Sequence, residues 1–176
     1  FIIGLPRTGT TSISIALLDY NFKVAHTAYT KQAFALADVL SDSPCFCDYQ
    51  KLDTLFPGSK FVYLDRDLAD WIPSIQMLLK KMHTNLAPKT GIFNPVLKRS
   101  FNEAFDLYIK AEGAKTLILN EQAFAEEHLS ACYRSHKNQV LDYFAHRDDL
   151  LIINMSYKES LDQLLSFLDI PHAKDT

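Results

Sequence analysis

The chain opens with an unbroken apolar run that is followed by a glycine-bounded polar loop. Residues Phe1–Ile3 have the pattern of a strand buried on both faces. The segment from Gly4 to Gly9 is short enough for a tight loop, and apolar residues at helical spacing follow it. A strand, a glycine loop and a helix start in this order direct backbone N–H groups and the positive end of a helix dipole at one point. The opening residues therefore predict an anion site for a nucleotide-type ligand.

Strand-like and helix-like stretches alternate along the rest of the chain. The second clear buried strand is Phe61–Leu64, and the segment 150–154 returns to the same sheet. This alternation predicts an α/β fold, a three-layer sandwich with a mainly parallel central sheet of the P-loop nucleotide-binding type. We expect a single domain over residues 1–176, with a helical insert over about residues 85–148.

Local patterns give further expectations for individual elements. Apolar spacing predicts a helix face over 33–40, a short strand from Cys45, a helix over 97–108 and a second long helix over 121–146. Ser156 and Glu159 have the spacing of a capping box, which predicts the start of the last helix there.

Composition narrows the classes of partner. A net charge of −3 provides no general attraction to nucleic acid, so any anion site must be local. No apolar run approaches the roughly 18 residues that a membrane span needs. The cysteines are too few and too poorly spaced to indicate zinc, and an odd number leaves one unpaired in any disulfide scheme. We therefore expect a cytoplasmic protein with no metal, no nucleic-acid partner and no membrane span, while the oligomeric state is left open.

The opening loop departs from the ATP-binding pattern at one position. Gly4 and Gly9 have the Walker A spacing, but Thr10 stands where that motif has its lysine. The nearby cation is Arg7, inside the loop. A P-loop kinase or nucleotide hydrolase lacking the lysine loses the charge that reaches the β- and γ-phosphates, so this alternative is disfavoured but stays open.

A second candidate anion-binding group follows the strand Phe61–Leu64. Arg66 stands just beyond that strand, and Ser74 follows eight positions later. An arginine at a strand's carboxyl edge offers a planar fork of donors to a phosphate, and a serine in the first turns of a helix adds a hydroxyl. The alternative is that Arg66 pairs with one of the aspartates around it.

The segment Gly4–Ser12 resembles the 5′-phosphosulfate loop of sulfotransferases, and Arg66 and Ser74 have the spacing of the pair that binds the 3′-phosphate in that family. The resemblance implies a sulfotransferase that moves a sulfuryl group from 3′-phosphoadenosine 5′-phosphosulfate (PAPS) to a hydroxyl of a carbohydrate or small-molecule acceptor. The product would be adenosine 3′,5′-bisphosphate. The donor-binding residues that it implies are Pro6, Arg7, Thr8, Gly9, Thr10, Thr11, Ser12, Arg66 and Ser74.

Transfer to an alcohol also needs a general base. Asp42 lies between the first helix and the Arg66 strand, roughly where carbohydrate sulfotransferases place a carboxylate base. His26, just past a short second strand, is the alternative, because cytosolic small-molecule sulfotransferases use a histidine; Asp48 is a third candidate. Arg7 would stabilise charge on the leaving phosphate. A non-catalytic nucleotide-binding protein stays open, since Asp42 also fits an ordinary turn.

Overall fold

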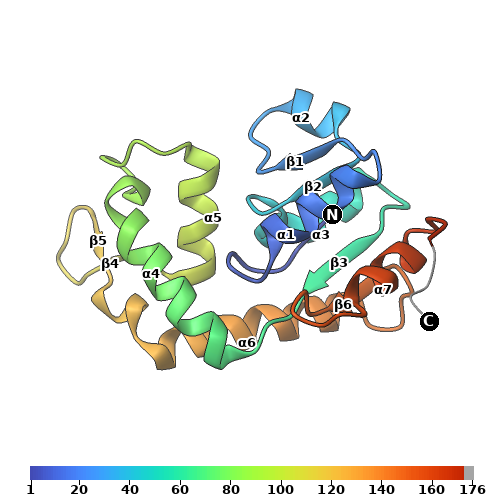
Figure 1. Ribbon diagram of the computed structural model, residues 1–176. Helices are drawn as coiled ribbons and strands as arrows, with labels where there is room; N and C mark the ends of the chain where they lie inside the picture. Colours follow the sequence, from blue (N-terminus) through green and yellow to red (C-terminus); the bar gives the residue numbers. More distant parts are fainter. Residues whose placement is uncertain (173–176) are drawn as a thin grey trace. The chain divides into compact units, whose positions relative to one another are not determined.

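The computed structural model describes residues 1–172, which form two compact units (Figure 1). The first unit contains Phe1–Asp67 together with the chain from Tyr143 onward. The second unit is the intervening segment, Leu68–Asp142. The single domain with an insert over about residues 85–148 stays a prediction.

Parallel strands form the centre of the first unit. They are β1 (Val24–His26), β2 (Val39–Ser41), β3 (Phe61–Leu64) and β6 (Leu150–Ile153). β1 pairs with β2, and β3 pairs with β6. The opening segment joins the two pairs, because Ile2 N donates to the Leu40 carbonyl at 2.9 Å and Ile3 N donates to the Val62 carbonyl at 2.8 Å. The expectation of an α/β fold with parallel strands is confirmed.

Helices pack on these strands through alternating side chains. Helices α1 (Thr10–Asp19) and α7 (Ser160–Phe167) share one apolar core with the strands. In Figure 1 the red α7 lies next to β6. The core consists of Ile2, Ile13, Leu17, Val39, Val62, Leu64, Ile153 and Leu164. Phe61, one position out of phase with Val62, instead contacts Phe144 at 4.8 Å between ring centroids.

The other helices of the first unit are α2 (Lys31–Leu36) and α3 (Cys45–Leu55). The second unit contains α4 (Leu68–Leu86), α5 (Pro95–Phe105), the antiparallel strands β4 (Tyr108–Lys110) and β5 (Leu117–Leu119), the 3₁₀ helix η1 (Glu121–Phe124) and α6 (Glu126–Tyr143). Trp71 is buried in this unit and packs against two other aromatic rings. Its ring centroid lies 4.7 Å from that of Tyr133 and 6.3 Å from that of Phe105.

Several predicted element boundaries are wrong. The predicted helix over 97–108 ends at Phe105, because Asp106 adopts a left-handed conformation with φ of 48° and a strand follows. The predicted helix over 121–146 is broken at Ala125, whose backbone is extended. The segment 85–148 therefore contains strands as well as helices.

Two further local expectations in the first unit are also wrong. Cys45 begins a helix, not a strand. The last helix starts at Ser160, and its N-cap residue, Glu159, makes no side-chain capping bond. The proposed capping box with Ser156 is therefore not formed.

An ion-pair cluster ties α3 to the chain after α6. Arg147 donates from Nη1 and Nη2 to the two carboxylate oxygens of Asp53, at 2.7 and 2.9 Å, and the Tyr143 hydroxyl donates to the same carboxylate at 2.8 Å. The bond from Arg147 is the largest cause that holds the pKa of Asp53 below its usual value. This carboxylate therefore stabilises the folded state above the unfolded pKa, about 3.9, and the contribution is lost as pH falls through the folded pKa.

Asp53→Asn is expected to lower the free energy of unfolding by about 1 kcal/mol at pH 7, with a smaller difference from wild type at pH 3. Urea denaturation at both pH values measures this. Glu103→Gln, at the exposed i,i+4 pair with Arg99, is the matched control and should change little at either pH. An equal loss for Asp53→Asn at both pH values would contradict the ionic role of Asp53.

Candidate functional site

The opening loop turns sharply at the carboxyl edge of the strands. Gly4 has no room for a side chain: a Cβ atom there would lie 2.8 Å from Leu64 Cβ and 2.9 Å from Leu64 N. Arg7 and Gly9 both adopt left-handed backbone conformations, with φ of 70° and 110°. The Thr8 hydroxyl donates to the Leu5 carbonyl at 2.6 Å and so closes the turn from inside. These features hold the loop close to β3 and lead directly into α1.

The start of α1 has the properties of an anion site. Its N-cap residue is Gly9, and no side chain caps the helix. The first-turn N–H groups have no partners within a helix, and the helix dipole adds positive potential at the same point. Thr11 and Ser12 are exposed beside this turn, whereas Thr10 is buried.

Arg66 joins the strand edge to the loop. It follows β3, and its Nη1 atom donates to the Arg7 carbonyl at 2.6 Å. This bond engages one of the five N–H donors of the guanidinium group. Arg7 itself has an exposed side chain. Two separate sequence motifs, the loop and the strand-end arginine, are thus brought into contact.

Ser74 lies in α4, which belongs to the second unit. Arg66 belongs to the first unit. The pairing of Ser74 with Arg66 around one phosphate therefore stays a prediction.

Asp42 stands immediately after β2 in a left-handed conformation, with φ of 62°. The backbone N–H of Ser43 donates to Asp42 Oδ1 at 2.8 Å, and the Thr10 hydroxyl donates to Oδ2 at 3.4 Å. Its side chain is 15% exposed. Burial raises the pKa of this carboxyl, and the charge of His26 and the two hydrogen bonds oppose that shift.

His26 is the last residue of β1, and its ring faces Asp42. The distance from His26 Nε2 to Asp42 Oδ2 is 3.7 Å, and His26 Nδ1 lies 2.9 Å from the Ser41 hydroxyl. The His26 side chain is 38% exposed. The two residues that the sequence offered as alternative bases are therefore neighbours beside α1. Asp48, the third candidate, lies in α3 and pairs with Lys51 at 3.1 Å.

Ser41 and Ser14 were not identified from the sequence. Ser41 is the last residue of β2, which the predicted helix over 33–40 concealed. Its position next to Asp42 is the feature of the sequence that could have identified Ser41. In the structure it is a buried polar residue at the end of β2. Ser14, one turn into α1, shows no sequence signal of its own.

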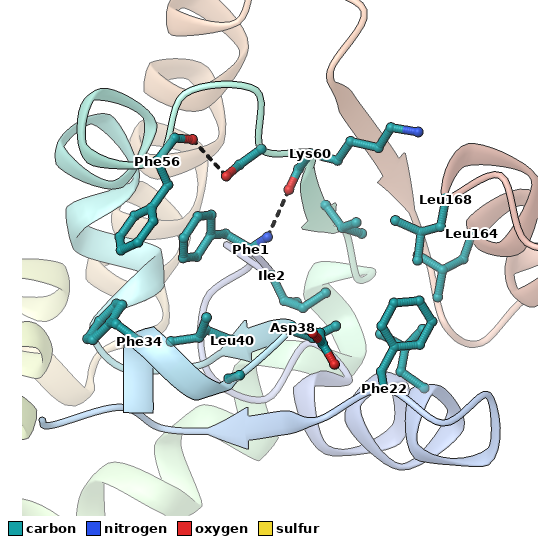
Figure 2. Close-up of a pocket in the computed structure, with 15 residues that line it drawn as sticks. Phe1, Ile2, Phe22, Phe34, Asp38, Leu40, Phe56, Lys60, Leu164 and Leu168 are labelled. Atoms are coloured by element: carbon teal, nitrogen blue, oxygen red, sulfur yellow. Dashed lines mark hydrogen bonds between the residues drawn. The ribbon is translucent and has the colours of Figure 1, made fainter. Parts of the chain in front are cut away.

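Two pockets lie at opposite edges of the first unit. A pocket of about 230 Å³ is mainly apolar and lies where the strands begin; Figure 2 shows Phe1, Phe22 and Leu164 around it, with the Phe1 amino group donating to the Lys60 carbonyl at 2.8 Å. A pocket of about 210 Å³ lies at the carboxyl ends of β3 and β6, where Asp65 and Asn154 line it. The second pocket is therefore at the same edge as the loop.

The described part of the chain, residues 1–172, contains no group of three or more His, Cys, Asp or Glu side chains that could hold a metal ion. Within the same residues, no helix combines the length and the apolar character needed to cross a membrane.

Parallel strands with an uncapped helix start at their carboxyl edge are the arrangement that phosphate-binding α/β proteins use. The comparison with protein families identifies the class further. The family model described as the sulfotransferase domain matches residues 26–176, and the chain belongs to this family. No curated protein matches the chain. The loop from Gly4 to Gly9 precedes the matched residues, so the match does not include it.

Proposed function

We propose that this protein transfers a sulfuryl group from PAPS to a hydroxyl of a carbohydrate or small-molecule acceptor in the cytoplasm, on a three-layer fold. Membership of the sulfotransferase family supports sulfuryl transfer. The observation that supports the choice of donor is the bond from Arg66 Nη1 to the Arg7 carbonyl, because it holds a second cationic side chain, the proposed ligand of the 3′-phosphate, against the loop. Cys45 and Cys132 are free thiols, which fits a reducing compartment.

The residues present fit a donor that carries phosphate groups on both the 5′ and the 3′ oxygen of its ribose. Gly4 and Gly9 remove the side chains that would fill or strain the loop, and the uncapped start of α1 offers N–H groups to an anion. The loop amides and Arg7 would hold the 5′-phosphosulfate. Arg66 and Ser74 would hold the 3′-phosphate. Removing one donor that stabilises developing charge typically costs about 10²–10³ in rate.

The acceptor side of the proposed site contains the acid–base groups. Sulfuryl transfer resembles phosphoryl transfer in needing in-line attack and stabilisation of the leaving phosphate. Asp42 and His26 stand at the ends of the paired strands β2 and β1, and Thr10 links them to the start of α1. A hydroxyl that reaches His26 is thus within the same small region as the proposed donor site.

The competing function is a P-loop kinase or nucleotide hydrolase. Thr10 occupies the position of the Walker lysine, and its hydroxyl donates to Asp42. A side chain directed to Asp42 does not serve the β- and γ-phosphates of ATP. The kinase or hydrolase function is therefore disfavoured, and the following test distinguishes it from sulfuryl transfer.

Adenosine 3′,5′-bisphosphate is expected to stabilise the protein, by about 2.7 kcal/mol at 100 times its dissociation constant. ATP with Mg²⁺ at the same concentration should give a much smaller shift, because ATP has no 3′-phosphate. Thermal unfolding with each ligand measures both shifts. Stabilisation by ATP with Mg²⁺ and none by the bisphosphate would refute the proposed donor.

A further inference from the structure

We propose that Nε2 of His26 is the atom that takes the proton of the acceptor hydroxyl, and that Ser14 and Ser41 are positioning residues that keep this atom unprotonated. The catalytic part of this inference rests on the proposed function. The part that concerns the protonation of the ring rests on a chain of hydrogen bonds within the first unit.

The chain of hydrogen bonds starts in α1. The Ser14 hydroxyl donates its single hydrogen to the Thr10 carbonyl at 2.6 Å. Ser14 Oγ also lies 2.8 Å from Ser41 Oγ, and Ser14 has no second hydrogen for this contact. The Ser41 hydroxyl must therefore be the donor. Ser14 is 5% exposed and Ser41 is fully buried, so water does not compete for either hydroxyl.

The same reasoning extends to the histidine ring. The hydrogen of the Ser41 hydroxyl is engaged with Ser14, so Ser41 Oγ acts as the acceptor in its 2.9 Å contact with His26 Nδ1. The Nδ1 atom must then carry hydrogen. A neutral imidazole has one N–H group, and Nε2 is therefore left with a lone pair.

A carboxylate faces Nε2. Asp42 Oδ2 lies 3.7 Å away, and an ionised carboxylate has no hydrogen to donate to the ring. Tyr29 and Cys45 are two further titratable groups whose charge interacts with Asp42. Burial raises the pKa of Tyr29 and raises that of Cys45 to about 12, so both are neutral near pH 7. The imidazolium formed by protonation of Nε2 thus faces an anion.

With Nε2 unprotonated, the proposed reaction proceeds as follows. The O–H bond of the acceptor breaks and its proton moves to Nε2 of His26. The acceptor oxygen forms a bond to sulfur, the bond from sulfur to the donor's phosphate oxygen breaks, and its electron pair stays on the leaving phosphate. Since 38% of the His26 side chain is exposed, a bound hydroxyl has access to the ring. Asp42 then stabilises the positive ring.

The protonated nitrogen can be observed directly in the free protein. Long-range ¹H–¹⁵N spectra of histidine-labelled protein, recorded where the rings are neutral, distinguish the two tautomers. The signals of His26 are those absent from His26→Gln. Hydrogen on Nδ1 in the wild-type protein is the expected result. Hydrogen on Nε2 would overturn the inference without any variant having to fold.

Two variants test the chain of hydrogen bonds. Ser14→Ala does not touch the ring, yet it releases the Ser41 hydroxyl to donate to Nδ1 and should move the hydrogen to Nε2. Ser41→Ala should also abolish the preference for Nδ1. Ser160→Ala is the matched control, because Ser160 is a buried serine of the first unit that bonds the Asn154 carbonyl instead. An unchanged tautomer in both Ser14→Ala and Ser41→Ala would overturn the inference.

The failure of this inference is distinguishable from failure of the proposed function. If the wild-type ring carries hydrogen on Nδ1 but adenosine 3′,5′-bisphosphate does not stabilise the protein, the donor assignment fails and the hydrogen-bond chain stands. If the bisphosphate stabilises the protein and the ring carries hydrogen on Nε2, the donor assignment stands and the role of His26 Nε2 is refuted.

Discussion

Arg66→Ala is expected to abolish the thermal stabilisation that adenosine 3′,5′-bisphosphate gives the wild-type protein. Two effects act together. The variant loses the guanidinium group proposed to bind the 3′-phosphate, and hydrogen bonds to charged groups are worth about 1.5–3 kcal/mol, or roughly 10–100-fold in affinity. It also loses the bond that holds the Arg7 carbonyl at 2.6 Å, so the loop is less firmly ordered.

A second ligand separates these two effects. Adenosine 5′-phosphate has no 3′-phosphate, so its binding should depend on Arg66 only through the loop. If Arg66 binds the 3′-phosphate, Arg66→Ala loses the preference for the bisphosphate over the monophosphate. If Arg66 only orders the loop, both ligands weaken equally and the preference is retained, which would contradict the 3′-phosphate assignment. Arg99→Ala, which removes an arginine from an exposed pair in α5, is the control.

His26→Gln is expected to lower kcat by about 10²–10⁴-fold, which is the usual contribution of a positioned general base. Binding of adenosine 3′,5′-bisphosphate should stay as in the wild type, because His26 contacts Ser41 and Asp42 and not the loop amides. The measurement is the release of the bisphosphate from PAPS in the presence of a panel of hydroxyl-bearing acceptors, with thermal unfolding to verify the bound state.

Two comparison variants make the His26 result specific. His146→Asn replaces an exposed histidine of the first unit, where an asparagine tolerates the φ of 62°, and should keep full turnover. Asp42→Asn should lower turnover less than His26→Gln, since Asp42 stabilises the charged ring and does not itself take the proton. Full turnover in His26→Gln, or a larger loss in Asp42→Asn, would show that the carboxylate is the base.

The conformation of the loop from Gly4 to Gly9 was predictable because its determinants are local. The apolar run Phe1–Ile3, the spacing of Gly4 and Gly9 and the start of a helix are contiguous in the sequence, and the backbone chemistry of such a loop follows from the order of these parts. Arg66 was predictable for the same reason, since it directly follows a clearly buried strand.

The acid–base cluster was only half predictable. Asp42 and His26 were identified one at a time, but their contact depends on the pairing of β1 with β2. Each of these strands has three residues, which is too short for periodicity to distinguish from a helix. The pairing of β1 with β2 places Ser41 opposite His26, and that contact between separate segments brings the two side chains together.

The Thr10 hydroxyl, which donates to Asp42 from the first turn of α1, also restricts how this sequence could have diverged. In ATP-binding loops the same position holds a lysine that reaches the nucleotide. Here a lysine would begin its path beside the Asp42 carboxylate, and the attraction between the two charges would draw the ammonium group toward the acid–base cluster. Under the proposed function, residue 10 is therefore constrained by the acceptor side of the site as well as by the donor side, and a change of nucleotide class would require Asp42 to change with it.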